Sequence, residues 1–332
     1  MRKNKIIIIT LLLLVAIADR SIAQVDPHFS QYYADPLWLN SALTGVINGD
    51  ARINSNYKSQ WSDVNNAYQT TAVSADFRAT NKVGLGLSVL DQSAGDHTFN
   101  YFSAYGSFSY AISISNDGNQ RLSFGVQAGI INRSFDLSKL QFGDQYNPVG
   151  GFDPNVANYE NLPNNNSTVF DANSGIFYYD GDPQSTVNPF GGVSVGHLSR
   201  PKDAFSADGK GKIPLRYTVN GGVRIAISDN ITLTPNALYI QQQDSYIKAL
   251  GAYSEFKFDD DKGLILGVME RFNDATVFDV GYHVSSLIIG TSYDFNNSSL
   301  SSATNGRGGI ELSLSYVFHK KIQEPEPICP RL

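Results

Sequence analysis

The sequence contains the stretch Leu215-Arg216-Tyr217-Thr218-Val219-Asn220-Gly221-Gly222-Val223-Arg224-Ile225-Ala226-Ile227, in which apolar side chains occupy every odd position except Gly221. The even positions carry polar or small side chains. Successive side chains of a β-strand point to opposite faces, so this period of two predicts a strand with one apolar face and one polar face. The apolar face must contact either a protein core or lipid.

Comparable stretches follow one another from Arg52 to Phe318, and together they predict an all-β protein of about 14 strands. The predicted strands are 51–58, 68–79, 82–91, 98–113, 120–134, 168–179, 188–199, 213–227, 230–242, 246–258, 262–272, 275–283, 286–295 and 307–318. The stretch from Phe99 to Tyr110 is apolar at both odd and even positions, so the sequence does not decide which of its two faces is the apolar face of the strand.

The first residues have the pattern of a secretory signal peptide. Arg2, Lys3 and Lys5 precede an apolar run over 6–18, and Ser21-Ile22-Ala23 supplies small residues for cleavage. The run is shorter than the roughly 20 residues of a membrane-spanning helix, which disfavours the alternative of an uncleaved anchor. We therefore predict a cleaved signal peptide over 1–23 and an exported mature chain that begins at Gln24.

Composition narrows the function further. Removing the four basic residues and the one acidic residue of 1–23 from the 25 and 31 of the whole chain leaves 21 basic and 30 acidic residues, a net charge of −9. That sign disfavours nucleic acid as a partner. Cys329 is the single cysteine, so no internal disulfide is expected.

The predicted connections alternate between short and long. With both ends of the mature chain placed on the periplasmic side, the connections after even strands are mostly short turns such as Thr80-Asn81 and Ser228-Asp229. Those on the other side include long ones over 135–167, 200–212 and 296–306. This asymmetry is typical of an outer-membrane barrel, and lipid-facing strands satisfy all their backbone groups only in a closed barrel. We predict a transmembrane antiparallel up-and-down β-barrel over 51–318; two soluble β-domains are the alternative.

Catalytic and metal motifs are weak. The five histidines are dispersed without metal-ligand spacing, and no G-x-S-x-G motif occurs. We expect no enzyme activity, no cofactor and no metal, although His197 with nearby serines leaves an outer-membrane hydrolase as an alternative. Six charged side chains are predicted to project into the lumen, where the simplest role is to fill a polar interior: Arg216, Arg224, Lys248, Glu255, Glu270 and Arg271.

Several motifs resemble those of the PorP/SprF family. The mature start contains Asp26-Pro27-His28-Phe29-Ser30-Gln31-Tyr32, followed by Asp35-Pro36 and Asn40-Ser41-Ala42, where the family has N-P and N-P-A. Further similar segments are Tyr57-Lys58-Ser59-Gln60-Trp61, Lys82-Val83-Gly84-Leu85-Gly86, Leu122-Ser123-Phe124-Gly125-Val126-Gln127-Ala128-Gly129, Gly192-Val193-Ser194-Val195-Gly196-His197-Leu198 and Cys329-Pro330-Arg331-Leu332. The resemblance covers essentially the whole mature chain.

The resemblance implies an outer-membrane barrel of the type IX secretion and gliding machinery of Bacteroidetes. Such a barrel would aid secretion and surface attachment of a large cargo protein such as an adhesin, by holding its C-terminal sorting domain, and would contact periplasmic machinery components. A diffusion or ligand-uptake channel is the alternative. We expect residues 24–50 to fold into or under the lumen as a plug, and residues 319–332 to form a periplasmic tail, for which disorder without a role is the alternative.

On the same resemblance, we expect partners to contact the mature start, the first strand's end and the terminal motif: Asp26, Pro27, Phe29, Gln31, Tyr32, Trp61, Cys329, Pro330, Arg331 and Leu332.

Overall fold

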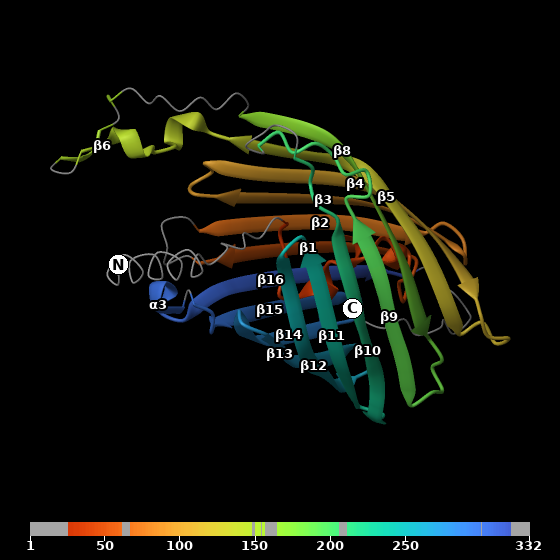
Figure 1. The fold of residues 1–332 in the computed structure, drawn as a ribbon. Helices are drawn as coiled ribbons and strands as arrows, with labels where there is room; N and C mark the ends of the chain where they lie inside the picture. The colour runs from red at the N-terminus through yellow and green to blue at the C-terminus, as the bar shows by residue number, and fades with distance from the viewer. Residues whose placement is uncertain are drawn as a thin grey trace, which may run out of the picture.

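Fourteen antiparallel strands close into a barrel, as the alternating pattern predicted (Figure 1). The computed structural model describes residues 26–61, 67–147, 150–153, 155–156, 165–205, 211–299 and 301–319. The barrel strands are β1 (Ala51–Gln60), β2 (Tyr68–Arg78), β3 (Val83–Ala94), β4 (Phe99–Ser113), β5 (Gln120–Phe135), β8 (Asn166–Asp180), β9 (Val187–Gly196), β10 (Arg216–Ser228), β11 (Ile231–Gln242), β12 (Ser245–Asp259), β13 (Lys262–Arg271), β14 (Ala275–Val284), β15 (Leu287–Asn296) and β16 (Arg307–Phe318). Each strand pairs with its neighbours in the chain, and β1 pairs with β16 to close the sheet.

Strand boundaries agree with the predicted ranges to within three residues, and the two boundaries that flank the connection between β9 and β10 are among those that differ most. We predicted that the first of these strands would continue to Ser199, but it ends at Gly196. His197 adopts a positive φ of 59°, and its backbone N–H donates to the side chain of Asn173 of β8 instead of to a backbone carbonyl of that strand. The next strand begins at Arg216 rather than at Ile213, which is buried inside the barrel.

The strands present apolar side chains outward and polar side chains inward. On β5 the outward residues Phe124, Val126 and Ile130 are 39%, 53% and 43% exposed. The residues between them, such as Ser123 and Gln127, are buried in the lumen. This is the inverse of a water-soluble barrel and matches a wall that contacts lipid.

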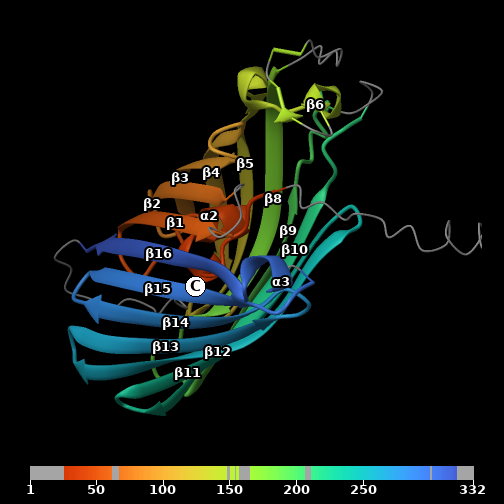
Figure 2. The same ribbon diagram turned by 90° about the vertical axis from the view of Figure 1, so that its left-hand side faces the viewer.

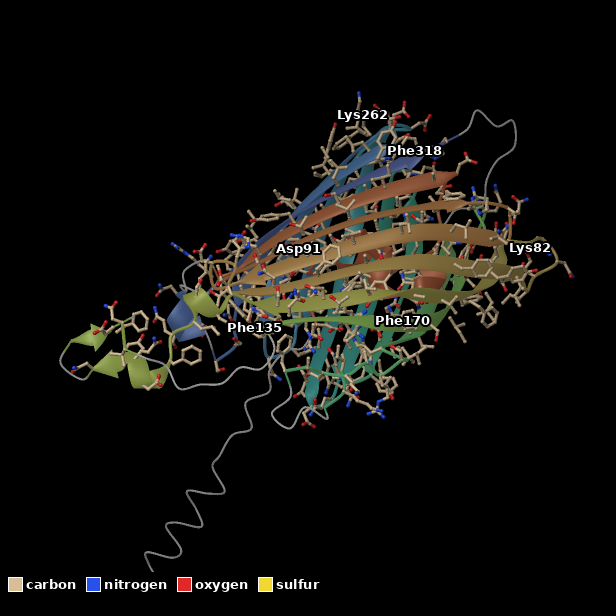
Figure 3. All side chains as sticks on the ribbon, turned by 90° about the horizontal axis from the view of Figure 1, so that it is seen from above. Lys82, Asp91, Phe135, Phe170, Lys262 and Phe318 are labelled. Atoms are coloured by element: carbon tan, nitrogen blue, oxygen red, sulfur yellow. The ribbon has the colours of Figure 1, made fainter. Side chains whose placement is uncertain are left out.

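The two ends of the barrel differ. At one end, hereafter the short-turn end, strands are joined by tight connections such as 229–230 and 285–286. The other end, hereafter the long-loop end, carries the 136–165 connection with the small hairpin β6 (Tyr146–Asn147) and β7 (Gly151–Phe152), which stands beyond the barrel (Figure 2). Lys82 and Phe135 mark the short-turn and long-loop ends in Figure 3. Among the described residues, no helix has the length and apolar character needed to cross a membrane.

Residues 26–50, hereafter the inner segment, lie inside the barrel and supply much of its core. The segment contains η1 (Tyr32–Ala34), α2 (Pro36–Leu39) and η2 (Ser41–Leu43). Leu43 is fully buried in a cluster with Phe177 of β8 and Phe190 of β9. The segment ends at the short-turn end, where the N–H of Asp50 donates to the carbonyl of Phe318.

The start of the inner segment corrects one expectation. We placed both ends of the mature chain on the same side, but Asp26 lies at the long-loop end, against His197 and Arg216. The chain therefore passes through the lumen from the long-loop end to the short-turn end before it enters β1. Alternation could not reveal this path because the segment contains no strand.

Candidate functional site in the barrel lumen

The expected partner-binding residues fall into three groups. Asp26, Pro27, Phe29, Gln31 and Tyr32 lie in the lumen and are buried. Trp61 lies outside the inner segment, at the long-loop end of β1, where its ring packs edge-on against Tyr68. Cys329, Pro330, Arg331 and Leu332 lie outside the described residues.

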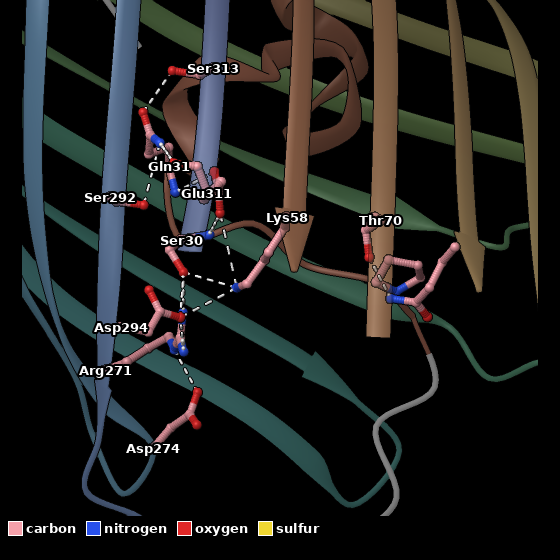
Figure 4. Close-up of polar contacts among 12 residues, drawn as sticks. Ser30, Gln31, Lys58, Thr70, Arg271, Asp274, Ser292, Asp294, Glu311 and Ser313 are labelled. Carbon is pink, nitrogen blue, oxygen red and sulfur yellow. Dashed lines mark hydrogen bonds and ion pairs between the residues drawn. The ribbon is translucent and has the colours of Figure 1, made fainter. Parts of the chain in front are cut away.

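Four buried charged side chains hold the inner segment near its start: Lys58 of β1, Arg271 of β13, Asp294 of β15 and Glu311 of β16, hereafter the four-charge cluster (Figure 4). Their common partner is Ser30 of the inner segment. Its hydroxyl donates to Asp294 Oδ2 at 2.7 Å and accepts from Lys58 Nζ at 2.9 Å and Arg271 Nη1 at 2.8 Å. Two cations and two carboxylates from four strands therefore meet at one serine.

Within this cluster, Glu311 binds the backbone of the inner segment. Its carboxylate oxygens accept the N–H groups of Ser30 and Gln31 at 2.7 and 3.0 Å. The side chain of Gln31 accepts from Ser313 at 2.7 Å and donates to Ser292 at 3.3 Å (Figure 4). Hydrogen bonds to a charged acceptor are the stronger kind, and here they fix two successive residues.

A second group of charges lies at the long-loop end: Asp26 of the inner segment, Asp171 of β8, His197 and Arg216 of β10, hereafter the His197 cluster. The Nε2 atom of His197 lies 2.8 Å from Asp26 Oδ2, and Nδ1 lies 2.9 Å from Asp171 Oδ2. Arg216 Nη1 donates to Asp26 at 3.3 Å, and its guanidinium stacks over the ring of Trp38 at 4.7 Å. This cluster ties the start of the inner segment to the wall.

His197 lies between two carboxylates, which favours the doubly protonated ring. Burial alone would lower the pKa of His197, but the charge of Asp26 and the hydrogen bonds to Asp171 and Asp26 raise it to about 9. Ser199 donates to Asp171 Oδ1 at 3.0 Å and not to the imidazole. Both ring nitrogens are therefore taken by carboxylates, which is not the geometry of a base beside a nucleophilic serine.

Polar side chains of the wall satisfy backbone carbonyls of the inner segment. Ser123 donates to the carbonyl of Ala42 at 2.7 Å, Gln127 to that of Leu37 at 2.8 Å, and Ser194 to that of Leu39 at 3.0 Å. The segment has too little regular structure to pair these carbonyls itself, and a buried carbonyl without a donor lowers stability. The polar inner face is thus complementary to one particular backbone path.

Glycines of the wall leave room for that path. A Cβ at Gly125 would lie 2.2 Å from the carbonyl carbon of Ser41, and one at Gly84 would lie 2.4 Å from the carbonyl oxygen of Thr44. Both distances are far below van der Waals contact. Gly84 of the motif Lys82-Val83-Gly84-Leu85-Gly86 and Gly125 of the motif that begins at Leu122 are therefore needed for close contact with the inner segment.

The predicted inward charges are only partly correct. Arg216, Arg224 and Arg271 project into the lumen, Arg224 donating to the buried Asn188, and Glu255 is buried on the inner face of β12. Glu270 and Lys248 face outward: Glu270 precedes the inward Arg271 and accepts from Thr276, while Lys248 lies over the ring of Tyr246. Charge alone does not tell which face a residue occupies; the phase of the neighbouring apolar residues does.

The inner segment separates two cavities of the lumen. A cavity of about 360 Å³ at the long-loop end is lined by residues including Asp26, Trp61 and Asp274. A second, of about 350 Å³, opens toward the short-turn end and is lined by residues including Tyr33, Ile47 and His283. Their linings share no residue. Among the residues that the structure describes, no group of three His, Cys, Asp or Glu side chains is arranged to hold a metal ion.

Sequence reasoning missed most of the wall residues that contact the inner segment. Lys58, Gln127, Ser194 and His197 stood inside motifs, which was a usable signal. Asp171, Asp294 and Glu311 carried none, because each lies in an ordinary alternating strand and meets its partner only across the barrel.

A family model matches most of the chain, and solved structures share its fold. Residues 21–316 match the model described as type IX secretion system membrane protein PorP/SprF. No curated protein matches the chain. The crystal structure of the Ralstonia pickettii toluene transporter TbuX is similar with a TM-score of 0.53 and 8% identity, over 85% of this chain and 93% of that chain. The P. putida toluene transporter TodX aligns with a TM-score of 0.46 and 8% identity, over 85% and 93% of the two chains. At such low identity the likeness to TbuX shows a shared barrel fold alone.

Proposed function

The chain belongs to the PorP/SprF family of type IX secretion system membrane proteins, and from this premise we propose that it is an outer-membrane partner that aids secretion and surface attachment of a large exported protein. The bound element is the C-terminal sorting domain of that exported protein, for example an adhesin. Periplasmic components of the machinery contact the opposite side. A cleaved signal peptide over 1–23 delivers the chain to the outer membrane.

One observation carries the choice of a binding role over a channel role: the inner segment occupies the lumen. It is held by charge clusters at two levels and separates two cavities whose linings share no residue. A diffusion channel needs a continuous polar path, whereas a docking protein needs only a rigid barrel and exposed loops. The occupied lumen therefore favours binding.

The partner contacts are assigned by position. Trp61 and the loops of the long-loop end face the exported protein, and the terminal Cys329 to Leu332 face periplasmic components. Asp26, Pro27, Phe29, Gln31 and Tyr32 are engaged within the barrel and therefore support binding by fixing the inner segment.

The direct test is affinity isolation of the tagged protein from native membranes, with mass spectrometry of the chains that stay bound. We expect one large exported protein together with components of the secretion machinery. The Trp61→Ala variant, which leaves the hydrogen bonds of the inner segment in place, should recover less of the exported protein than wild type. Isolation of the barrel alone from cells that secrete normally would overturn the proposal.

A further inference from the structure

Among the residues that the structure describes, one edge of the barrel wall has no pairing strand at the long-loop end. Strand β8 begins at Asn166, but its pairing with β9 covers only Ser174 to Tyr179. On its other side β8 pairs with β5 along its whole length, from Asn166 to Asp180. Within the described residues, no strand lies beside 166–173 of β8 on the side away from β5.

The register tells which backbone groups this edge presents. The N–H of Phe135 donates to the carbonyl of Asn165, so the odd-numbered residues of this strand exchange hydrogen bonds with β5. The even-numbered residues point the other way. Two contacts agree with this assignment: Leu198 N–H donates to the carbonyl of Ala172, and Ser199 Oγ, whose hydrogen Asp171 Oδ1 also accepts, lies 3.2 Å from the carbonyl oxygen of Phe170.

From Phe170 toward the long-loop end, no backbone hydrogen-bond partner lies beside this edge in the part of the chain that the structure describes. The backbone groups of Asn166 and Thr168 and the N–H of Phe170 point to the open side, at the spacing of a β-ladder. The side chains of Asn166, Thr168 and Phe170 are exposed. The segment Asn166-Ser167-Thr168-Val169-Phe170 has no charged residue and no proline, the features by which proteins protect an open edge.

The edge lies beyond the lipid-facing belt. Phe170, 60% exposed and labelled in Figure 3, pairs with Ile130, the last large apolar outward residue of β5. The next outward pairs toward the long-loop end are Asn132 with Thr168 and Ser134 with Asn166. Polar side chains replace apolar ones at this level, so the open backbone groups face water and not lipid.

We propose that the edge of β8 from Asn166 to Phe170 binds an extended segment of the exported polypeptide by β-strand addition. A row of alternating N–H and C=O groups is complementary to another extended backbone, and the net charge of the mature chain disfavours nucleic acid. The exposed side chains of Phe170 and Leu198 lie where this edge meets the lipid-facing belt. They offer an apolar contact to one side chain of the added strand. The inference rests on the proposed function and names the surface that performs it.

Two substitutions at one position separate backbone from side chain. Thr168→Pro removes an N–H that faces the open side, so no bond to β5 is lost, and proline is tolerated on edge strands. Thr168→Ala keeps the N–H and removes the same side-chain contact with Asn132. In affinity isolation, we expect the amount of exported polypeptide recovered with Thr168→Pro to fall by about tenfold or more. The amount recovered with Thr168→Ala should stay within about twofold of wild type.

Cross-linking supplies a readout that does not depend on the proline variant folding. In a Cys329→Ser background, Thr168→Cys and Asn132→Cys are each labelled in native membranes with a thiol-reactive photo-cross-linker. Both positions face outward at the same height, but Asn132 lies on a strand that is paired on both sides. We expect cross-links from position 168 to the C-terminal region of the exported polypeptide at several times the yield from position 132.

The outcomes are distinguishable. If wild-type protein recovers no exported polypeptide, the proposed function fails. If wild type recovers it but Thr168→Pro recovers as much, or both cysteine positions cross-link equally, the edge assignment alone fails. Cross-links from position 168 to this chain itself would also overturn the assignment, because its own residues would then cover the edge.

Discussion

The four-charge cluster and the His197 cluster hold the same inner segment by different chemistry. The four-charge cluster uses a lysine, an arginine and two carboxylates of four strands, which meet at Ser30. The His197 cluster depends on an imidazolium, whose charge is lost within a few pH units of neutrality. The inner segment therefore has one attachment built from four charged side chains of the strands and another, nearer its start, that weakens as the medium becomes alkaline.

The largest effect is expected at the four-charge cluster. Lys58→Met removes one cation and leaves Asp294 and Glu311 buried with less compensation, which costs about 3–5 kcal/mol of unfolding free energy. Lys262→Met is the matched control, because Lys262 is half-exposed and its ion pair with Asp259 contributes less than about 1 kcal/mol. Denaturant unfolding in detergent micelles measures both. Equal losses in the two variants would contradict a structural role of the four-charge cluster.

Because of the His197 cluster, we expect the folded protein to lose stability toward alkaline pH. The pKa of His197 rises from 6.5 to about 9 on folding, so its contribution is complete below pH 6.5 and disappears as pH rises through about 9. The groups that face it are Asp26, Asp171 and, through Asp26, Arg216. With one pKa unit worth 1.36 kcal/mol, the loss is on the order of 3 kcal/mol.

Unfolding free energies at pH 6.5 and pH 9 in wild type and His197→Gln check this prediction. The wild-type protein should lose stability between the two values, and the variant should lose much less. A parallel decline in both would mean that another group titrates.

Much of the fold was predictable because strand alternation is a local property of the sequence. The alternation around Val219 and Val126 predicted strands and outward faces correctly, and the spacing of connections predicted two unlike ends. The lumen was less predictable, because Ser30 and Glu311 are 281 positions apart and neither has a local pattern that names the other. Lys248 and Glu270 were misplaced because a charge does not by itself tell which face of a strand it occupies. Asp294 was missed for another reason, since its partners Ser30, Lys58 and Arg271 meet it only in the tertiary structure.

A smaller effect is expected where the wall contacts the inner segment through a glycine and not through charges. Gly125→Ala places a methyl group 2.2 Å from the carbonyl carbon of Ser41, so the inner segment must shift at a cost of about 1–3 kcal/mol. Gly143→Ala is the control, because a Cβ there meets nothing within 4 Å. The unfolding midpoints of the two variants should differ, and coincident midpoints would show that the wall does not contact the segment at this glycine.

The smallest effect concerns a single hydrogen bond. Ser123→Ala leaves the buried carbonyl of Ala42 without its 2.7 Å donor, which costs about 1 kcal/mol. Ser113→Ala, on the exposed end of β4, should change the unfolding free energy by less than about 0.5 kcal/mol. Indistinguishable values would place the inner segment away from β5.

Single-channel conductance in planar bilayers tests most directly whether the inner segment closes the lumen. Wild-type protein should show no sustained conductance, because residues 26–50 separate the two cavities. Lys58→Met, which loosens the segment, should show opening events, while Lys262→Met should behave as wild type. A steady, open-pore conductance from the wild-type protein would contradict a lumen closed by the inner segment.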